Sequence, residues 1–272
     1  MPQSRATPPA VSPSPQDAYP PAQIALLVAQ VGVRKATLPA VPTLALGVLA
    51  GAFIAFGAMF FTLVMTDNPL GLGPGRLLGG LAFSLGLILV VVGGAELFTG
   101  NNLVVMAWAD RKITGVQLAR NWTLVYAANL VGALGSALMV HWSGTLELGG
   151  GAVAETAGAI ARAKVTLGFA EAFFRGILCN VLVCLAVWLC YAAHDVPGKV
   201  LAIVFPISAF VALGFEHSVA NMYLIPIAML AGAEGVTAAG FFRNLAPVTL
   251  GNVVGGGVFV ALVYWLIYLR SH

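Results

Sequence analysis

Six long apolar runs dominate this sequence and constrain its fold more than any other feature. A helix needs roughly 20 apolar residues to cross the hydrocarbon core of a bilayer, and every run is long enough. We therefore predict an all-α integral membrane protein with six membrane-spanning helices and both termini on one side. The runs are Val41–Thr66, Leu77–Ala109, Asn121–Val140, Val165–Ala193, Val200–Ala233 and Asn244–Leu269.

The composition excludes the main soluble classes. Only 8% of the residues are charged, 60% are hydrophobic and the mean hydropathy is +0.94, whereas a soluble domain carries roughly 25% charged residues. A soluble enzyme and a disordered protein are both excluded. The net charge of +3 is too small and dispersed for a nucleic-acid binder. The three cysteines, Cys179, Cys184 and Cys190, lack metal-ligand spacing, so we predict no metal and no cofactor.

The residues before the first run divide into two segments. Residues 1–22 hold seven of the fifteen prolines, which predicts a flexible Pro-rich tail. Residues 23–40 predict an amphipathic helix that lies at the membrane surface, with Arg34 and Lys35 toward the lipid headgroups. Residues 41–270 then form the six-span domain. Lysine and arginine are more frequent in the flanks on the side of the termini, which predicts that both termini are cytoplasmic.

The second and fifth runs are overlong, and polar residues interrupt both. The interruptions lie at Gly93–Asn102 and Leu213–Asn221, and in each a glycine precedes a glutamate that hydroxyl and amide residues follow. Each half of the chain has three spans, an odd number, so the two halves must be inverted relative to one another. Paired interruptions of this kind point to a substrate site at the midplane of a transporter.

The pair Glu216-His217 is the most distinctive chemical feature of these interruptions. Ionisable residues inside an apolar run are costly and usually face a pathway, and a histidine that donates a hydrogen bond suits a small anion. The alternative is a structural pair that holds the loop without touching a substrate. Thr99 either faces the same pathway or caps a half-helix, and for Asn101 we predict a capping role.

Other residues near the interruptions allow two interpretations. Lys35 and Lys164 lie at opposite mouths, where they either attract an anion or remain solvated interfacial lysines. Glu171 and Arg175 are four residues apart, which favours a pair near the interface with the arginine extended toward water. Five bulky residues are more typical of a core or a lipid-facing surface than of a gate: Phe83, Leu87, Leu97, Phe98 and Phe210.

Glycine spacing in the first and last spans predicts close helix packing. Gly47-x-x-x-Gly51 and Gly251-x-x-x-Gly255 place small residues one turn apart, and this pattern permits tight helix crossing in lipid. The pattern indicates a compact bundle or an oligomer and carries no information about a substrate.

Five blocks of the sequence, taken in order, resemble the formate/nitrite transporter family. The resemblance covers about residues 23–270 and implies an aquaporin-like fold of two inverted three-helix repeats in which the second and fifth helices are broken. It also implies a homopentamer in the bacterial inner membrane with a pore in every protomer. The blocks are Val33–Thr37, Leu81–Asn102, Ile177–Trp188, Gly214–Pro226 and Pro247–Gly257.

The resemblance also implies roles for individual residues. His217 resembles the central pore histidine, Thr99 the loop threonine that faces it, and Glu216 the acid beside it. Asn180 and Asn221 resemble pore-lining asparagines close to the histidine, and Asn252 an asparagine of the last helix. Phe83, Leu87, Phe98 and Phe210 resemble constriction residues, with Leu97 beside them. Lys35 resembles the basic residue of the inner vestibule and Lys164 the lysine of the outer one.

These roles predict a transporter for a small monovalent anion, most specifically formate. The lysines would draw the anion in, the phenylalanines would remove its water, and His217 would donate a hydrogen bond or a proton. Arg175 stands where some formate channels carry an uncharged residue, so nitrite remains open, as do hydrosulfide, lactate and acetate. A neutral-solute pore of aquaporin type is the alternative of another class, although both interruptions lack Asn-Pro-Ala boxes. We predict no enzymatic activity.

Overall fold

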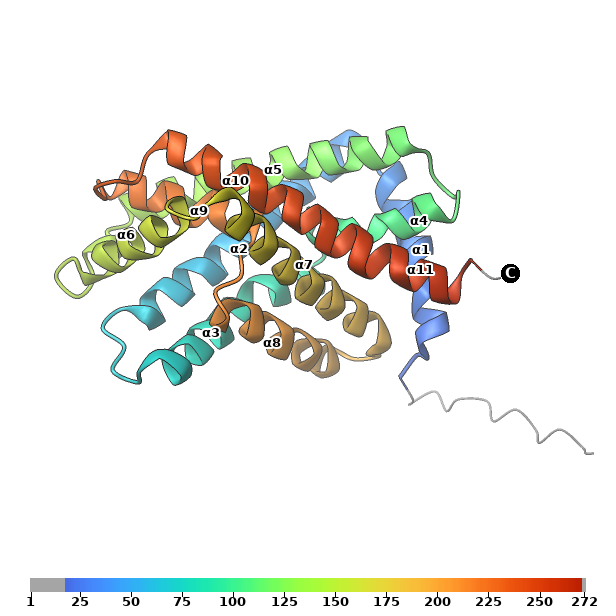
Figure 1. The fold of residues 1–272 in the computed structure, drawn as a ribbon, viewed down its shortest axis with the longest axis horizontal. Coiled ribbons are helices and arrows are strands. Elements are labelled where there is room, and N and C mark those ends of the chain that lie inside the picture. Colours follow the sequence, from blue (N-terminus) through green and yellow to red (C-terminus); the bar gives the residue numbers. More distant parts are fainter. Residues whose placement is uncertain (1–17, 271–272) are drawn as a thin grey trace, which may run out of the picture.

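The computed structural model describes residues 18–270, and this part of the chain is built from helices, as predicted (Figure 1). Within it, five helices are long and apolar enough to cross a membrane, and α8 (Val196–Ala212) and α9 (Ser218–Leu230) are shorter apolar helices. The five are α2 (Ala40–Met65), α3 (Leu72–Gly93), α5 (Gly115–Trp142), α7 (Phe169–Ala192) and the run Ala238–Tyr268, which comprises α10 (Ala238–Val253), the π-helical segment η3 (Val254–Leu262) and α11 (Val263–Tyr268).

Helix α1 (Pro21–Thr37) starts slightly earlier than the sequence predicts. Of the predicted tail, residues 1–17 lie outside the described residues, while residues 21–22 form the first turn of α1. Proline fits this first turn because a helix leaves its first N–H groups unbonded. Ile24, Ala25 and Val28 are buried against a cluster that includes side chains of α4 (Val105–Ala109) and α7. The apolar face of α1 therefore packs on the protein.

Two helices end abruptly where the sequence is interrupted. Helix α3 gives way at Gly94 to a non-helical segment that leads into the 3₁₀ helix η1 (Gly100–Val104) and then α4. Helix α8 ends at Ala212, and α9 begins only at Ser218. Gly94 has φ +81° and Gly214 has φ +71°, a left-handed conformation that glycine adopts without strain. In both places this glycine lies two residues before the glutamate.

The two glycine pairs permit the close helix packing that the sequence predicts. A Cβ atom at Gly47 would lie 2.5 Å from the Cβ of Ala128 on α5, and one at Gly51 would overlap the carbonyl of Asn129. Gly251 and Gly255 approach backbone carbonyls of α7 in the same way. The prediction of tight crossings is confirmed, since any larger residue would force α2 from α5, and α10 and η3 from α7.

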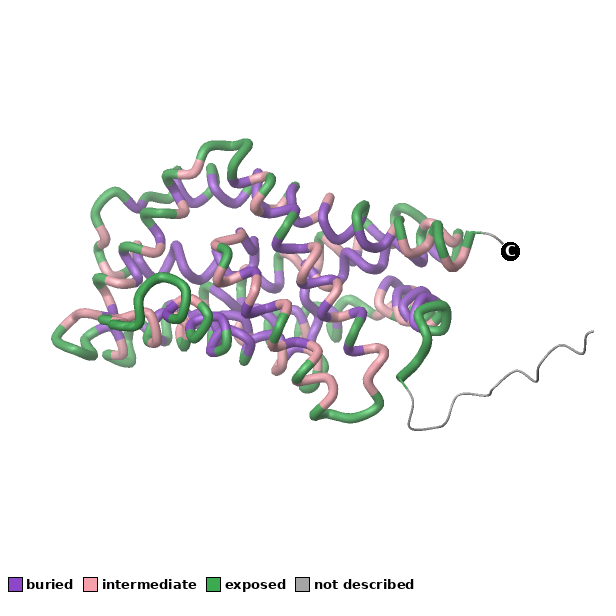
Figure 2. Tube along the Cα trace, turned by 60° about the horizontal axis from the view of Figure 1, so that its bottom comes forward, coloured by how far each residue is buried: buried purple, intermediate pink, exposed green. Residues whose placement is uncertain are grey.

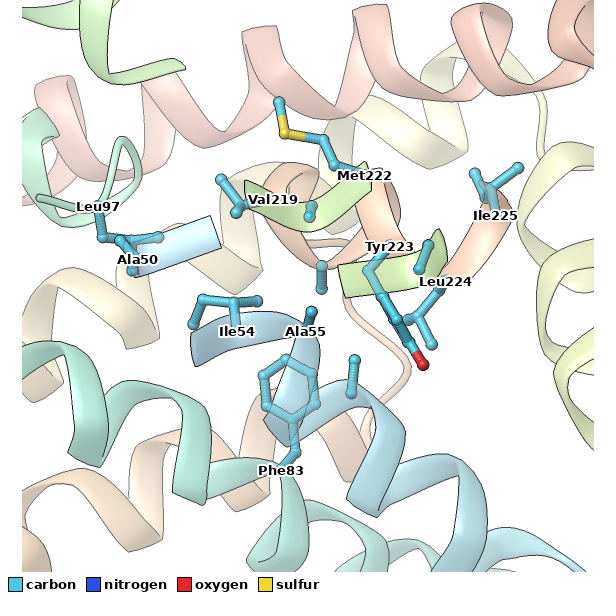
Figure 3. Close-up of a cluster of buried hydrophobic side chains, with 14 of the residues drawn as sticks. Ala50, Ile54, Ala55, Phe83, Leu97, Val219, Met222, Tyr223, Leu224 and Ile225 are labelled. Atoms are coloured by element: carbon cyan, nitrogen blue, oxygen red, sulfur yellow. The ribbon is translucent and has the colours of Figure 1, made fainter. Parts of the chain in front are cut away.

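The buried residues follow the centre of the bundle, and the exposed ones follow its outside and its end loops (Figure 2). Figure 3 shows part of the core, where Phe83 from α3 lies near Ala55 of α2, and Leu97 lies near Ala50. Helix α1 and the end of α11 lie at one end of the long axis, and α6 (Ala152–Val165) lies at the other (Figure 1). We call these two ends of the molecule the α1 end and the α6 end.

Candidate functional site

In the described part of the chain, two of the cavities lie beside the interruptions, one at each. The α1-side cavity has a volume of about 410 Å³ and is lined by residues that include Lys35, Glu96 and Leu97. The α6-side cavity has a volume of about 170 Å³ and is lined by residues that include Glu216 and His217. Both interruptions, which the sequence marks as candidates for a substrate site, therefore lie on cavity surfaces.

A thin apolar layer separates the two cavities. Leu87 lines the α1-side cavity and Phe83 lines the α6-side cavity. These residues are four apart on α3, a rise of about 6 Å along a helix. Phe210 shares the α6-side surface with Phe83, and their ring centroids are 5.6 Å apart in an edge-to-face arrangement. Solutes that passed between the cavities would meet this layer of buried side chains.

The five predicted bulky residues divide between the cavities and the core. All five are buried in one hydrophobic cluster. Leu87 and Leu97 line the α1-side cavity, and Phe83 and Phe210 line the α6-side cavity. Phe98 lines neither of the two and packs edge-to-face against Trp122 and Tyr126, with centroids 6.2 Å and 4.8 Å away. Its side chain points toward α5, so the ring anchors the segment between α3 and η1 on that helix.

His217 lies at the base of the α6-side cavity and contacts Thr99 across the bundle. The imidazole Nε2 is 2.9 Å from Thr99 Oγ1, and the two residues are 3% and 0% exposed. The ring of Phe210 lies almost parallel to the imidazole, with centroids 5.9 Å apart. The two interruptions, more than a hundred residues apart in sequence, thus meet at one hydrogen bond inside the apolar layer.

The surroundings of His217 determine which nitrogen carries the proton. The backbone N–H of Ala220 donates to Nδ1 at 3.0 Å, so His217 is the N-cap of α9. A nitrogen that accepts this bond carries no hydrogen. The hydrogen of a neutral ring is therefore on Nε2, and Nε2–H donates to Thr99 Oγ1. A second proton on Nδ1 would place two donors face to face and would break the cap of α9.

Glu216 anchors a polar cluster beside His217. Lys164 Nζ lies 2.8 Å from Glu216 Oε1, and the Asn221 amide donates to Glu216 Oε2 at 2.7 Å. Asn221 also donates to Asn244 Oδ1 at 2.8 Å, and Asn244 donates to the backbone carbonyl of Lys164 at 2.9 Å. A buried carboxylate needs such a set of partners. The cluster ties α6, the loop, α9 and α10 together.

The other interruption carries the same arrangement with different residues. Lys35 Nζ lies 2.7 Å from Glu96 Oε1, and the Asn101 amide donates to Glu96 Oε2 at 2.6 Å. Asn101 also donates to Asn121 Oδ1 at 3.0 Å, and Asn121 donates to the backbone carbonyl of Lys35 at 3.0 Å. Glu96 therefore has the same kinds of partner, in the same order, as Glu216.

A buried asparagine closes each cluster from the next helix. Asn129 donates to the carbonyls of Gly47 and Glu96 and accepts from the N–H of Phe98. Asn252 donates to the carbonyls of Gly176 and Glu216 and accepts from the N–H of Ser218. Each asparagine satisfies backbone groups that the interrupted helix leaves free.

Lys35 lines the α1-side cavity and Lys164 lines the α6-side cavity. A buried carboxylate pairs with each ammonium group, so Lys35 points to Glu96 and not to the lipid headgroups as predicted. Asn101 bonds Glu96 through its side chain and provides no cap for η1.

The asparagines predicted close to the pore histidine are buried. Asn180 and Asn221 are 0% exposed and line neither cavity. Asn180 donates to the carbonyls of Thr99 and Asn252. Asn180 and Asn252 therefore supply amide donors to backbone carbonyls of the two interruptions.

Sequence reasoning gave no role in the site to Glu96, Asn121, Asn129 or Asn244. The sequence does contain a signal for the asparagines, which is a shared spacing. Asn121 and Asn129 lie eight positions apart in the third apolar run, and Asn244 and Asn252 lie eight positions apart in the sixth. Polar amides that recur at the same spacing in two corresponding apolar runs indicate buried hydrogen-bonding partners.

Comparison with known proteins identifies the family of this chain. The family model described as formate/nitrite transporter matches residues 22–266. The formate channel FocA of Escherichia coli K12 is 41% identical over 278 residues, which cover 95% of this chain and 98% of that protein. The chain belongs to the formate/nitrite transporter family. It is accordingly an integral membrane protein, and its relatives are channels and transporters and not enzymes.

Two further similarities bear on fold and substrate. A solved structure described as a pentameric formate channel with formate bound aligns with a TM-score of 0.80 at 41% identity, covering 85% of this chain and 98% of that one. The uncharacterized transporter YrhG of Bacillus subtilis strain 168 is 45% identical over 254 residues, covering 92% of this chain and 94% of that protein. Some of these relatives are therefore named for a substrate, and others are not.

Proposed function

We propose that this protein transports a small monovalent anion, formate first, between the two cavities of each protomer of a homopentamer in the bacterial inner membrane. The contact between His217 Nε2 and Thr99 Oγ1 inside an apolar layer carries the proposal. The relatives named as formate channels and the pentameric structure with formate bound support the substrate and the assembly. Nitrite is the second candidate, favoured by Arg175 on the surface of the α6-side cavity.

We propose the matching membrane topology. Helices α3 and η1–α4 form one broken span, and α8 and α9 form another, so residues 41–270 have six spans in two inverted halves. Residues 23–40 form an interfacial segment at the α1 end, which faces the cytoplasm with both termini. The ends of the described chain lie at that same end (Figure 1), as an even number of spans requires.

The charges of the cavities suit an anion. The α1-side cavity is lined by three cations and one carboxylate, namely Arg34, Lys35, Lys199 and Glu96. Lys35 neutralises Glu96, and within residues 18–270 the side chains of Arg34 and Lys199 form no hydrogen bond or ion pair. Such excess positive charge raises the local concentration of an anion. Arg34 and Lys199 therefore attract the anion, and Lys35 does not.

Two donors meet the anion at the apolar layer. Nε2–H of His217 can turn from Thr99 to an anion oxygen, and the hydroxyl hydrogen of Thr99 can serve a second oxygen. Because a neutral imidazole keeps its only N–H proton, His217 contributes a hydrogen bond, and the anion takes its proton from a hydronium ion in the cavity, which leaves water. The species that crosses Phe83 and Phe210 is then the neutral acid, which avoids the cost of burying a bare charge.

Flux into proteoliposomes of the purified protein tests this function. Formate and nitrite are compared at acidic and neutral pH, with His217→Asn as the matched variant because asparagine retains an N-cap acceptor. We expect formate flux to exceed nitrite flux and to rise as the pH falls in the wild type, and to be lost at both pH values in His217→Asn. Flux of a neutral solute without either anion, measured by osmotic swelling, would overturn the proposal in favour of a neutral-solute channel.

A further inference from the structure

The α6-side cavity holds one positive charge that the polar cluster does not neutralise. Its lining includes Arg76, Lys164, Arg175 and Glu216. Lys164 pairs with Glu216 at 2.8 Å, and Arg175 pairs with Glu171 at 2.6 Å. Arg76 forms no ion pair within residues 18–270. A half-buried guanidinium without a carboxylate partner is an incomplete electrostatic arrangement.

Two arginines from different helices converge on the loop that carries His217. Arg76 Nη1 donates to the carbonyl of Ala212 at 3.3 Å, and Arg175 Nη1 donates to the carbonyl of Gly214 at 3.2 Å. A Cβ atom at Gly214 would lie 3.0 Å from Arg76 Nη1 and 3.7 Å from Arg175 Nη1. Both guanidinium groups thus approach one point, and the absence of a side chain at Gly214 leaves that point open.

The free donors of the arginines define a ligand chemistry. A guanidinium has five N–H donors in a planar fork that matches two oxygens of a planar anion. Arg76 uses one of its nitrogens for Ala212, which leaves the rest of the fork unused. We propose that Arg76 and Arg175 form an anion-binding site at the mouth of the α6-side cavity that takes a planar oxyanion such as formate or nitrite before it reaches His217.

This site deepens the proposed function and rests on it for its role in transport. It would hold an anion with two oxygens better than a spherical halide, because only the former engages both donors of a fork. The competing explanation is purely structural, since cations at a helix C-terminus stabilise its last carbonyls. In that case the arginines would hold the end of α8 whether or not an anion is present.

Anion-dependent thermal stabilisation separates these explanations. The wild type and the variants Arg76→Gln, Arg76→Lys and Arg162→Gln are purified in a maltoside detergent without phospholipid, so that no lipid phosphate occupies the site. Each is titrated with sodium formate, sodium nitrite and sodium chloride. Arg162 is the matched control, because it is exposed on the same helix as Lys164 and lines neither cavity.

We expect formate and nitrite, more than chloride, to raise the unfolding temperature of the wild type. Arg76→Gln should raise the half-saturating anion concentration about tenfold, Arg76→Lys should raise it less, and Arg162→Gln should leave it unchanged. An Arg76→Gln variant that loses stability without anion but keeps the full anion response would overturn the site. A wild type with no response to either oxyanion would also overturn it.

The same variants distinguish this site from the proposed function. In proteoliposomes, Arg76→Gln should raise the half-saturating concentration for formate flux while the maximal flux stays close to that of the wild type. A protein that binds formate through Arg76 yet moves no anion would contradict the proposed function and leave the binding site standing. Equal half-saturation in Arg76→Gln and the wild type would remove the site and leave transport intact.

Discussion

The two interruptions of the bundle carry the same polar scaffold, yet only one of them carries an ionisable group that faces the other. At both, a lysine pairs with the glutamate, and two asparagines connect the pair to the next helices. The residue after the glutamate is Leu97 in the first interruption and His217 in the second. Under our proposal, this difference separates the residues that hold the interruption from the residue that acts on the anion.

The shared scaffold has a structural explanation. Backbone groups freed inside a membrane must find partners within the protein, and Asn129 and Asn252 supply them at equivalent places. Whatever both interruptions contain is explained by this need. The contact of His217 with Thr99 has no counterpart between the equivalent positions. The position equivalent to His217 in the first interruption is Leu97, and the position equivalent to Thr99 in the second is Val219. This asymmetry supports our proposal that His217 and Thr99 contact the anion.

The largest predicted effect is on stability, and it should be the same at both interruptions. Glu96→Leu and Glu216→Leu each leave a lysine and an asparagine without their buried partner, so we expect each to cost about 3–5 kcal/mol. Unfolding in mixed detergent micelles measures this cost. Glu171→Leu is the control, because its exposed pair with Arg175 contributes only about 0.2–0.5 kcal/mol. A Glu96 variant as stable as the wild type would break the equivalence of the two clusters.

A somewhat smaller effect should follow from removal of the asparagines behind the loops. Asn129→Leu and Asn252→Leu each remove three hydrogen bonds to the backbone. We expect a loss of about 2–3 kcal/mol for each, since buried backbone groups are left unpaired. The same unfolding assay checks this. A large loss for one variant and none for the other would show that the two loops are held differently.

The smallest predicted effect concerns transport alone. Thr99→Val removes the hydroxyl that contacts His217 but keeps the shape of the side chain, and it should lower formate flux about tenfold, the value of a lost hydrogen bond of about 1.4 kcal/mol. Thr99→Ser keeps the hydroxyl and should retain most of the flux. Initial rates in proteoliposomes measure both. Equal flux in Thr99→Val and the wild type would exclude a transport role for the hydroxyl.

Much of the fold was readable from the sequence, because it depends on local rules. Apolar length predicts the long helices, and a glycine followed by a glutamate marks each interruption. The partner of each carboxylate was not readable. Lys35 and Lys164 are 61 and 52 residues away from Glu96 and Glu216 in the chain, and no periodicity connects such pairs. Both lysines therefore looked like free cations at the surface.

The site itself was readable only in part. His217 and Thr99 attract attention as polar residues in apolar runs, but their contact depends on how two halves of the chain pack. The N-cap role of His217 was missed, because histidine is not among the residues that usually cap helices. That role matters chemically, since it directs the ring hydrogen to Nε2 and toward Thr99.

One measurement tests the central claim most directly, which is that His217 acts on the anion while its equivalent, Leu97, only fills space. Formate uptake and thermal stability are measured together in His217→Asn and in Leu97→Met. We predict that His217→Asn keeps the cap of α9 and a thermal midpoint near that of the wild type but loses formate flux, whereas Leu97→Met keeps both. Wild-type flux with an unchanged pH profile in His217→Asn would contradict the account.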